Sequence, residues 1–288
     1  MQANRTTTSH LPSDLGRRMT TLAGAILANV ALTSPILSEA SAAEGAGPIA
    51  RLIAAYPEQR LSREGNDLVW PDNTRMRIDD GKGLKPFEAW LANPDIEDML
   101  QIPYPAGAPA AAPEKNADPG RARNQTFFDK MYGDCRKGSG PAGVQPKLKT
   151  ISWLPKKIGQ RLEFSSVNGA ASALEAVSKE LDELPADFDK YLYPAAGTYN
   201  CRMIAGTDRP SAHGHGIAID IAVEHTSYWR WSKPGPNGDL PYKNEIRPEI
   251  VRAFEKHGFI WGGRWYHYDT MHFEYRPELL ADEPLPAP

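Results

Sequence analysis

Residues 211–220 read Ser-Ala-His-Gly-His-Gly-Ile-Ala-Ile-Asp, and this stretch decides the fold around it. Alternate side chains of a β-strand share a face. The three isoleucines at alternate positions from 217 onward would then fill a core, while Asp220 lies on the opposite face beside the small Gly216 and Ala218. His213 lies in the loop just before the strand and can fold back to meet Asp220. An imidazole and a carboxylate together supply half of a tetrahedral zinc site.

Residues 261–274 supply the other half and read Trp-Gly-Gly-Arg-Trp-Tyr-His-Tyr-Asp-Thr-Met-His-Phe-Glu. His272 begins a short strand whose Phe273 would face the core, and Asp269 lies three residues earlier in the preceding turn. Such a turn can present both groups to one point while only His272 touches a metal. Three protein ligands with an open fourth position are typical of a catalytic zinc site, not a structural one.

Composition sets the outer limits on the class of protein. The 288 residues are 41% hydrophobic and 24% charged, which suits a globular chain with a real core and excludes collagen-like and wholly disordered chains. The formal net charge of −3 gives no electrostatic case for a nucleic-acid partner. The two cysteines are too few for a thiolate zinc cage, so His and carboxylate side chains must hold any metal.

The first 43 residues predict a signal peptide. Arg17 and Arg18 precede a weakly apolar stretch, 19–37, and small residues follow at 40–43. We expect cleavage after residue 42 or 43 and export to the periplasm of a bacterium, by either the general or the twin-arginine route. No later segment is apolar enough to span a membrane.

The predicted export to the periplasm implies that the two cysteines are oxidised. An exported protein should pair Cys135 with Cys201, the alternative being two buried free thiols. A bridge over this loop would stabilise the fold by roughly 4 kcal/mol.

The rest of the chain divides by composition. We expect an N-terminal accessory region at 44–101, a Pro- and Ala-rich linker at 102–125, a catalytic domain at 126–281 and a flexible tail at 282–288. Helices and strands alternate without a regular βαβ repeat, which predicts an α+β fold with a small, mainly antiparallel sheet and flanking helices. The expected strands are 66–70, 148–154, 161–165, 198–205, 216–223, 259–261 and 271–275, and the expected helices are 86–91, 95–100, 170–184 with Asn168 as its cap, and 248–257.

The two motifs together carry a family resemblance. Ser-x-His-x-x-Gly-x-Ala-x-Asp at 211–220, followed by Trp-Gly-Gly-x-Trp at 261–265 and Asp-x-x-His-Phe-Glu at 269–274, resembles the D-alanyl-D-alanine carboxypeptidase and L-alanyl-D-glutamate endopeptidase family of zinc peptidases. These enzymes cut bacterial cell-wall peptides, and the amino-terminal hedgehog domain shares their fold. The resemblance covers residues 198–278.

The resemblance implies a role for each site residue. It implies His213, Asp220 and His272 as ligands of one zinc ion per chain, and Asp269 as the general base. It implies Arg202 as the group that stabilises the oxyanion, although Arg209 lies nearer the motif and is the alternative. Ser211 and Glu274 are read as groups that orient ligands.

Other residues and functions stay open at this stage. His215 and His267 either rim the cleft or are ordinary loop residues. The aromatic residues near the motifs either line a substrate groove or belong to the core: Trp229, Trp231, Trp261, Trp265 and Tyr268.

The leading hypothesis is a zinc metallopeptidase acting on peptidoglycan stem peptides, as an endopeptidase or a D,D-carboxypeptidase. The alternatives are a peptidase for other peptides and a non-hydrolytic zinc-containing protein that binds the cell wall or a partner.

Overall fold

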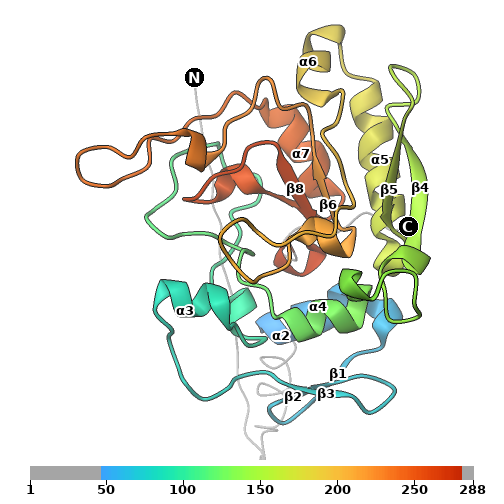
Figure 1. Ribbon diagram of the computed structural model, residues 1–288, viewed down its shortest axis with the longest axis vertical. Coiled ribbons are helices and arrows are strands. Elements are labelled where there is room, and N and C mark those ends of the chain that lie inside the picture. Colours follow the sequence, from blue (N-terminus) through green and yellow to red (C-terminus); the bar gives the residue numbers. More distant parts are fainter. Residues whose placement is uncertain (1–46, 281–288) are drawn as a thin grey trace, which may run out of the picture.

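The decisive stretch lies at the edge of a three-stranded antiparallel sheet with the order β6-β8-β7. These strands are β6 (Ala218–Asp220), β7 (Phe259–Trp261) and β8 (His272–Tyr275). Figure 1 shows the computed structural model, which describes residues 47–280, and the sheet lies at its centre. The signal peptide predicted at 1–43 and the tail predicted at 282–288 lie outside the described residues.

Helices of moderate length surround two further small sheets. An antiparallel sheet near the N-terminus contains β1 (Ser62–Glu64), β2 (Asp67–Val69) and β3 (Arg75–Arg77), and a hairpin contains β4 (Leu148–Trp153) and β5 (Gln160–Ser165). The helices are α2 (Pro48–Ala55), α3 (Phe87–Ala92), α4 (Gln125–Tyr132), α5 (Ala170–Asp182), α6 (Asp189–Leu192) and α7 (Pro248–Lys256). This arrangement confirms the predicted α+β class. No helix within residues 47–280 is long and apolar enough to cross a membrane.

Helix α7 packs on the core face of the central sheet. Ile217, Ile219 and Ile221 are fully buried, as the alternation predicts. Phe254 of α7 stacks on Phe273 of β8 with 3.8 Å between ring centroids. Pro248 occupies the first turn of α7, where its missing N–H costs nothing, so the predicted start of this helix is confirmed. The packing leaves the opposite face of the sheet free to carry Asp220 and His272.

The N-terminal region packs into the same hydrophobic core as the C-terminal region. Trp70, just after β2, lies 5.8 Å from Phe127 of α4 between ring centroids. Tyr56 donates a hydrogen bond of 2.5 Å to Glu278 across 222 residues of sequence. Figure 1 shows α4 between the β1–β3 sheet and the central part of the molecule.

The Pro- and Ala-rich segment follows the surface of the C-terminal region and is called the arm here (residues 104–124). The hydroxyl of Tyr104 accepts a hydrogen bond from the backbone N–H of Trp261. Farther along, the backbone carbonyl of Pro119 accepts from the indole of Trp265, and that of Gly120 accepts from Arg276. Donors spread over 261–276 therefore fix the arm along its length.

Three local predictions are wrong. Residues 198–205 form no strand and contain only an isolated bridge between Met203 and Pro210. The strand predicted at 216–223 is shorter, because Gly216 has a positive φ of 68° and ends the preceding 3-10 turn. Asn168 does not cap α5. Its own φ is 55°, and its side chain bonds Gln59 and Met131 instead.

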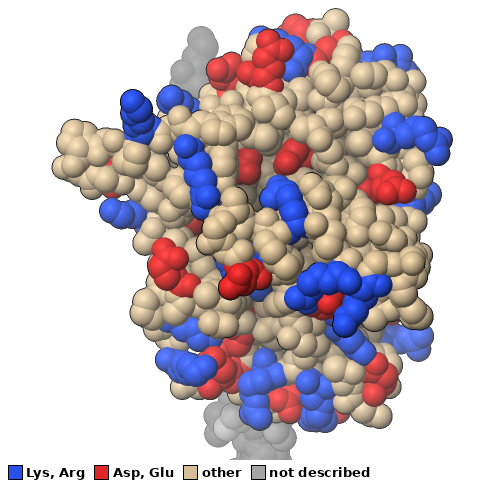
Figure 2. All heavy atoms as spheres, in the orientation of Figure 1, with Lys and Arg blue, Asp and Glu red and all other residues tan. Residues whose placement is uncertain are grey.

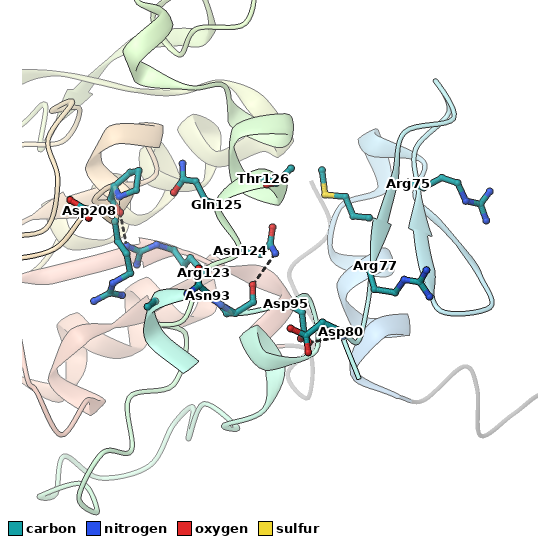
Figure 3. A pocket seen from close by; sticks show the side chains of 15 residues that line it. Arg75, Arg77, Asp80, Asn93, Asp95, Arg123, Asn124, Gln125, Thr126 and Asp208 are labelled. Carbon is teal, nitrogen blue, oxygen red and sulfur yellow. Dashed lines mark hydrogen bonds between the residues drawn. The ribbon is translucent and has the colours of Figure 1, made fainter. Parts of the chain in front are cut away.

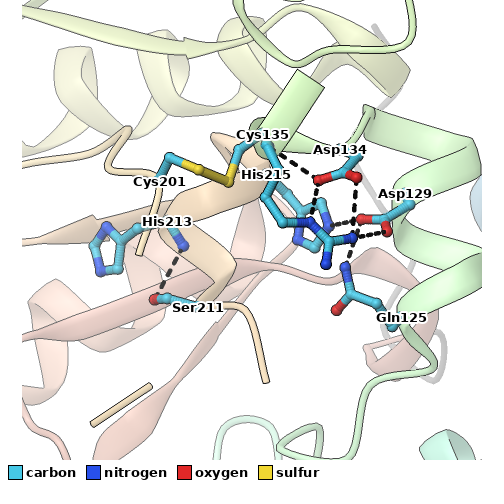
Figure 4. The surroundings of a disulfide bond; sticks show 9 residues. Gln125, Asp129, Asp134, Cys135, Cys201, Ser211, His213 and His215 are labelled. Carbon is cyan, nitrogen blue, oxygen red and sulfur yellow. Dashed lines mark hydrogen bonds and ion pairs between the residues drawn. A yellow bond between two sulfur atoms is a disulfide. The ribbon is translucent and has the colours of Figure 1, made fainter. Parts of the chain in front are cut away.

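The predicted disulfide is present. Cys135 and Cys201 are bonded, with 5.5 Å between their Cα atoms and 66 residues of sequence between them. A Cβ added to Gly214 would lie 3.4 Å from the sulfur of Cys135, so the bridge packs directly on the turn that carries His213. Figure 4 shows the bridge beside this turn. The bridge therefore ties α4 and its following turn to the loop before the decisive stretch.

Candidate metal centre

Three ligand-type side chains meet where β6 and β8 pair. Asp220 is the last residue of β6 and His272 the first of β8, and the two are direct partners in the antiparallel register. His213 comes from the 3-10 turn 212–215 just before β6. Because this turn doubles back over the strand end, a residue seven positions earlier reaches the carboxylate of Asp220. The side chains of these three residues form a group that could hold a metal ion.

The distances between the candidate ligand atoms suit a tetrahedral ion. His213 Nε2 lies 3.2 Å from an Asp220 carboxylate oxygen and 3.2 Å from His272 Nδ1. The other Asp220 oxygen lies 2.8 Å from His272 Nδ1. Ligands about 2.0–2.1 Å from a zinc ion in tetrahedral geometry are about 3.3 Å apart. The donor set of two imidazoles and one carboxylate, at this spacing, fits zinc.

The ring of His213 is oriented by the backbone around it. Its Nδ1 lies 2.5 Å from the carbonyl oxygen of Thr198, which makes Nδ1 the donor and leaves the lone pair on Nε2 facing Asp220. The hydroxyl of Ser211 accepts from the backbone N–H of His213 at 3.4 Å and caps the turn. Gly216, which ends this turn, has a positive φ of 68° that favours glycine, and a Cβ there would lie 2.7 Å from the Leu148 side chain of β4. Its small size therefore serves close packing of the turn on the hairpin.

The ring of His272 is oriented by a chain of charged groups. Its Nε2 lies 3.0 Å from Glu274, the residue two positions along the same face of β8. Glu274 in turn accepts a hydrogen bond of 2.9 Å from Arg123 at the end of the arm. Arg123 also donates to the carbonyl oxygen of Pro210, and both charged side chains are almost fully buried. The arm therefore fixes, through Glu274, which nitrogen of His272 faces the candidate metal.

The electrostatics of the group favour a cation. Burial works against a charged imidazole, yet the carboxylates of Asp220 and Glu274 raise the pKa of His272 to about 10. Burial would also raise the pKa of Asp220, but His213 and His272 outweigh it and hold this pKa far below its ordinary value. Positive charge is thus strongly stabilised at the point where the three ligand atoms meet.

Asp269 lies in the turn before β8 and lines a pocket together with Asp220 and His272. Its backbone N–H donates to Gly262, where a Cβ would come within 2.5 Å of the carbonyl oxygen of Asp269, so the glycine allows the turn to close. Its Oδ1 is buried without a hydrogen-bond partner among residues 47–280. Burial raises the pKa of Asp269 to about 6, with His272 opposing this shift and Asp220 adding to it. A buried carboxylate with a free oxygen and a pKa near neutrality is suited to accept a proton.

The arm also holds the turn that carries Asp269. Asp118, which is fully buried, accepts from the backbone N–H of His267 at 2.9 Å and from its Nδ1 at 2.6 Å. Arg121 donates to the carbonyl oxygen of His267 at 2.8 Å. His267 is therefore not a free residue at the rim. Through these hydrogen bonds to His267, the arm fixes the turn two residues before Asp269.

Asp220, His272 and Asp269 line a pocket of about 280 Å³. Figure 2 shows acidic atoms recessed at the centre of this face, with basic side chains beside them. Arg202 lines this pocket, whereas Arg209 lines the neighbouring one. The other residues around the opening are Arg121, Arg123, Ile204, Ala205, Ser211, Ala212, Tyr228, Trp231, Trp265, Met271 and Glu274.

The structure separates the remaining histidine and tryptophan candidates. His215 points to the opposite side of the turn from His213, where its Nε2 lies 3.0 Å from Asp129 of α4, as Figure 4 shows. Trp231 and Trp265 line the pocket. Trp261 is fully buried in the core. Of the aromatic residues considered, some therefore line the pocket and others belong to the core.

Sequence reasoning did not find Arg123, Asp118 or Thr198. Arg123 lies 151 residues from Glu274 and 90 residues from His213, within a segment that composition describes as a linker. The one available signal was charge, because Asp118, Arg121 and Arg123 are charged residues at the end of an otherwise Pro- and Ala-rich segment. Nothing in their spacing indicated which residues they contact.

Residues 205–275 match the model of a family described as D-alanyl-D-alanine carboxypeptidase. The matched segment contains His213, Asp220, Asp269 and His272. The match supports a relationship with this peptidase family. Together with the His and Asp group that could bind a metal, it supports a peptide hydrolase. No curated protein matches the chain.

Proposed function

We propose that this chain is a zinc-dependent peptidase that hydrolyses peptide bonds in the stem peptides of peptidoglycan. The observation that carries the proposal is the meeting of three ligand atoms and one buried, unpartnered carboxylate oxygen beside a single pocket. The family match over 205–275 supports a peptide substrate. The activity is either that of an endopeptidase or that of a D,D-carboxypeptidase, since both require the same constellation.

In this proposal His213, Asp220 and His272 hold one zinc ion per chain. Zinc bound in such a site supplies Lewis acidity, which makes a water molecule nucleophilic near neutral pH and polarises a substrate carbonyl. Thr198 and Glu274 keep the two imidazoles in the orientation that turns a lone pair toward the ion.

Asp269 is the proposed general base. Its free Oδ1 takes the proton of the attacking water, and the same carboxyl then gives the proton to the leaving amine. The raised pKa favours this exchange, because a group that titrates near the working pH can both accept and return a proton.

Arg202 is proposed to stabilise the oxyanion. It lines the pocket together with Asp220, Asp269 and His272, and its guanidinium makes no ion pair within residues 47–280. A donor aimed at the developing oxyanion lowers the barrier by about 3–4 kcal/mol. Arg209 is not proposed for this role, because it lines the adjacent pocket.

We further propose that the protein works after export to the periplasm, following cleavage of a signal peptide after residue 42 or 43. The Cys135–Cys201 bridge is compatible with an oxidising compartment. Peptidoglycan stem peptides are exposed in that compartment, so location and proposed substrate agree.

Digestion of purified peptidoglycan tests the proposal. The full chain, loaded with zinc, is incubated with purified sacculi with and without a chelator, and released peptides are identified by mass spectrometry. We expect product masses that identify one cleaved bond and so distinguish the endopeptidase from the carboxypeptidase. Release that is absent with zinc present, or equal with and without the chelator, contradicts the proposal. Absence of release would favour a non-hydrolytic binding protein.

A further inference from the structure

A second pocket lies beside the metal centre and has no part in the chemistry described above. Its volume is about 530 Å³, and it lies between β3, the start of α4 and the loop 208–210. Figure 3 shows Arg123, Asn124 and Gln125 on one side and β3 on the other. Arg123 lines both pockets, so the second pocket adjoins the one that contains the candidate ligands.

Two of the arginines that line this pocket are already paired. Arg75 lies 2.7 Å from Glu64 and 3.2 Å from Asp67, and Arg77 lies 3.4 Å from Asp67. In Figure 3 the side chains of Arg75 and Arg77 point away from the centre of the pocket. These two guanidinium groups are therefore directed at acidic partners and away from a ligand in this pocket.

The acidic residues of the pocket are also accounted for. Asp80 and Asp95 share the buried ammonium of Lys85, at 3.0 and 3.4 Å. Asp208 is exposed and makes no ion pair with Arg209 within the part of the chain that the structure describes. The carboxylates of the pocket therefore do not neutralise its remaining basic groups.

Arg209 is the basic group that lacks a partner. Its guanidinium is half-buried and makes no hydrogen bond or ion pair within residues 47–280. Burial, together with repulsion from Arg123 and Arg121, lowers the pKa of Arg209 to about 10, with Glu88 and Asp118 opposing this shift. Holding an unpaired cation near two others, partly out of water, costs free energy that a bound anion would recover.

We propose that Arg209 binds a free carboxylate of the peptide substrate and that this pocket is a specificity subsite next to the metal centre. The inference rests on the proposed function, because stem peptides carry carboxylates in addition to the peptide bond that is cut. A guanidinium suits this ligand, since its parallel N–H groups match the two carboxylate oxygens. Arg123 is committed to Glu274 and Pro210 and adds long-range attraction only.

Peptides that differ in one carboxylate test the subsite. A synthetic stem peptide is compared with versions in which each free carboxylate in turn is a carboxamide. Hydrolysis is measured with the zinc-loaded full chain, and affinity is measured by calorimetry with its zinc-loaded Asp269→Asn variant. We expect one of the carboxamides to raise KM and Kd about tenfold with kcat within about twofold, which is the effect of losing one charged hydrogen-bonded pair.

Arg209→Gln should abolish this discrimination. The Arg209→Gln protein should bind the carboxylate peptide and the carboxamide peptide with equal affinity. That affinity should be about as weak as the affinity of the parent protein for the carboxamide peptide. Arg77→Gln is the matched control, because Arg77 lines the same pocket but points away from it, and it should discriminate like the parent.

Each outcome bears on either the subsite or the chemistry. If Arg209→Gln still discriminates, or if it lowers kcat with KM unchanged, the subsite is wrong while peptide hydrolysis stands. If no peptide is cut but carboxylate-dependent binding is lost in Arg209→Gln, the subsite stands and the proposed hydrolysis fails. If no peptide is cut and none of the carboxamides binds differently from the parent peptide, both are wrong.

Discussion

The region that carries the motifs (residues 211–276, called the motif region here) and the arm (residues 104–124) meet at one site, but only the first has a recognisable sequence pattern. The motif region carries every candidate ligand at a spacing that suits a metal. The arm carries no motif, yet its Arg123 orients His272 through Glu274, and its Asp118 holds the turn before Asp269. The candidate ligands thus follow one another at local spacings, while the orientation of their side chains depends on contacts with a distant segment.

The largest expected effect comes from removing a candidate ligand in the motif region. Asp220→Ala takes away one proposed ligand and the negative charge shared by both histidines. We expect zinc content to fall from one per chain to near zero, and peptide release to fall at least about a thousandfold. Elemental analysis and a peptide-release assay measure the two effects. A variant that keeps its zinc and its turnover would show that Asp220 is not a ligand.

The next largest effect on zinc affinity and activity is expected from a single substitution in the arm. Arg123→Gln leaves Glu274 without its hydrogen-bonded cation and loosens the orientation of His272. We expect zinc affinity or activity to fall tenfold to a hundredfold. Competition with a chelator measures the affinity.

The control for Arg123→Gln is Arg252→Gln, which removes an exposed ion pair to Glu249 and should leave both quantities unchanged. Thermal unfolding of Arg123→Gln is measured in parallel, because breaking a buried ion pair costs about 3–5 kcal/mol. Unchanged zinc affinity and activity in a folded Arg123→Gln protein would mean that the arm contributes stability alone.

A smaller effect is expected where the arm grips the turn before Asp269. Asp118→Asn removes the charged acceptor for the ring of His267 and keeps a neutral acceptor for its backbone N–H. We expect kcat to fall about tenfold with zinc content unchanged, because Asp269 is displaced and the ligands are not. Loss of zinc together with kcat would place Asp118 in support of the ligands instead.

The smallest effect on activity is expected from the disulfide. Replacing both Cys135 and Cys201 by serine should lower the free energy of unfolding by about 4 kcal/mol, as measured in denaturant. At low temperature, activity should stay within about twofold of the parent, because the bridge packs on Gly214 of this turn while the carbonyl oxygen of Thr198 orients the imidazole of His213. A large loss of activity in the folded variant would show that the bridge positions His213.

The sequence predicted the parts of the fold that depend on short-range periodicity, and its motifs contain the three candidate ligands that the fold brings together. Alternation placed the three isoleucines in the core, and Pro248 marked the start of α7. Prediction from sequence was wrong where contacts between distant segments determine the local structure. Asn168 is a good helix cap by type, but Gln59 and Met131 engage its side chain. The run 198–205 looks like a strand, but the segment 209–213 that it pairs with turns into a 3-10 turn, so the pairing is limited to an isolated bridge and a few hydrogen bonds.

The most direct test of the account joins zinc content and turnover in Asp269→Asn, compared with the parent on the same peptidoglycan peptides. Asn has the size of Asp but cannot accept the proton, and Asp269 is not among the candidate ligands. We expect one zinc per chain in both proteins and a loss of turnover of about a hundredfold to ten-thousandfold in the variant. Turnover equal to that of the parent, with zinc retained, would show that Asp269 is not the general base.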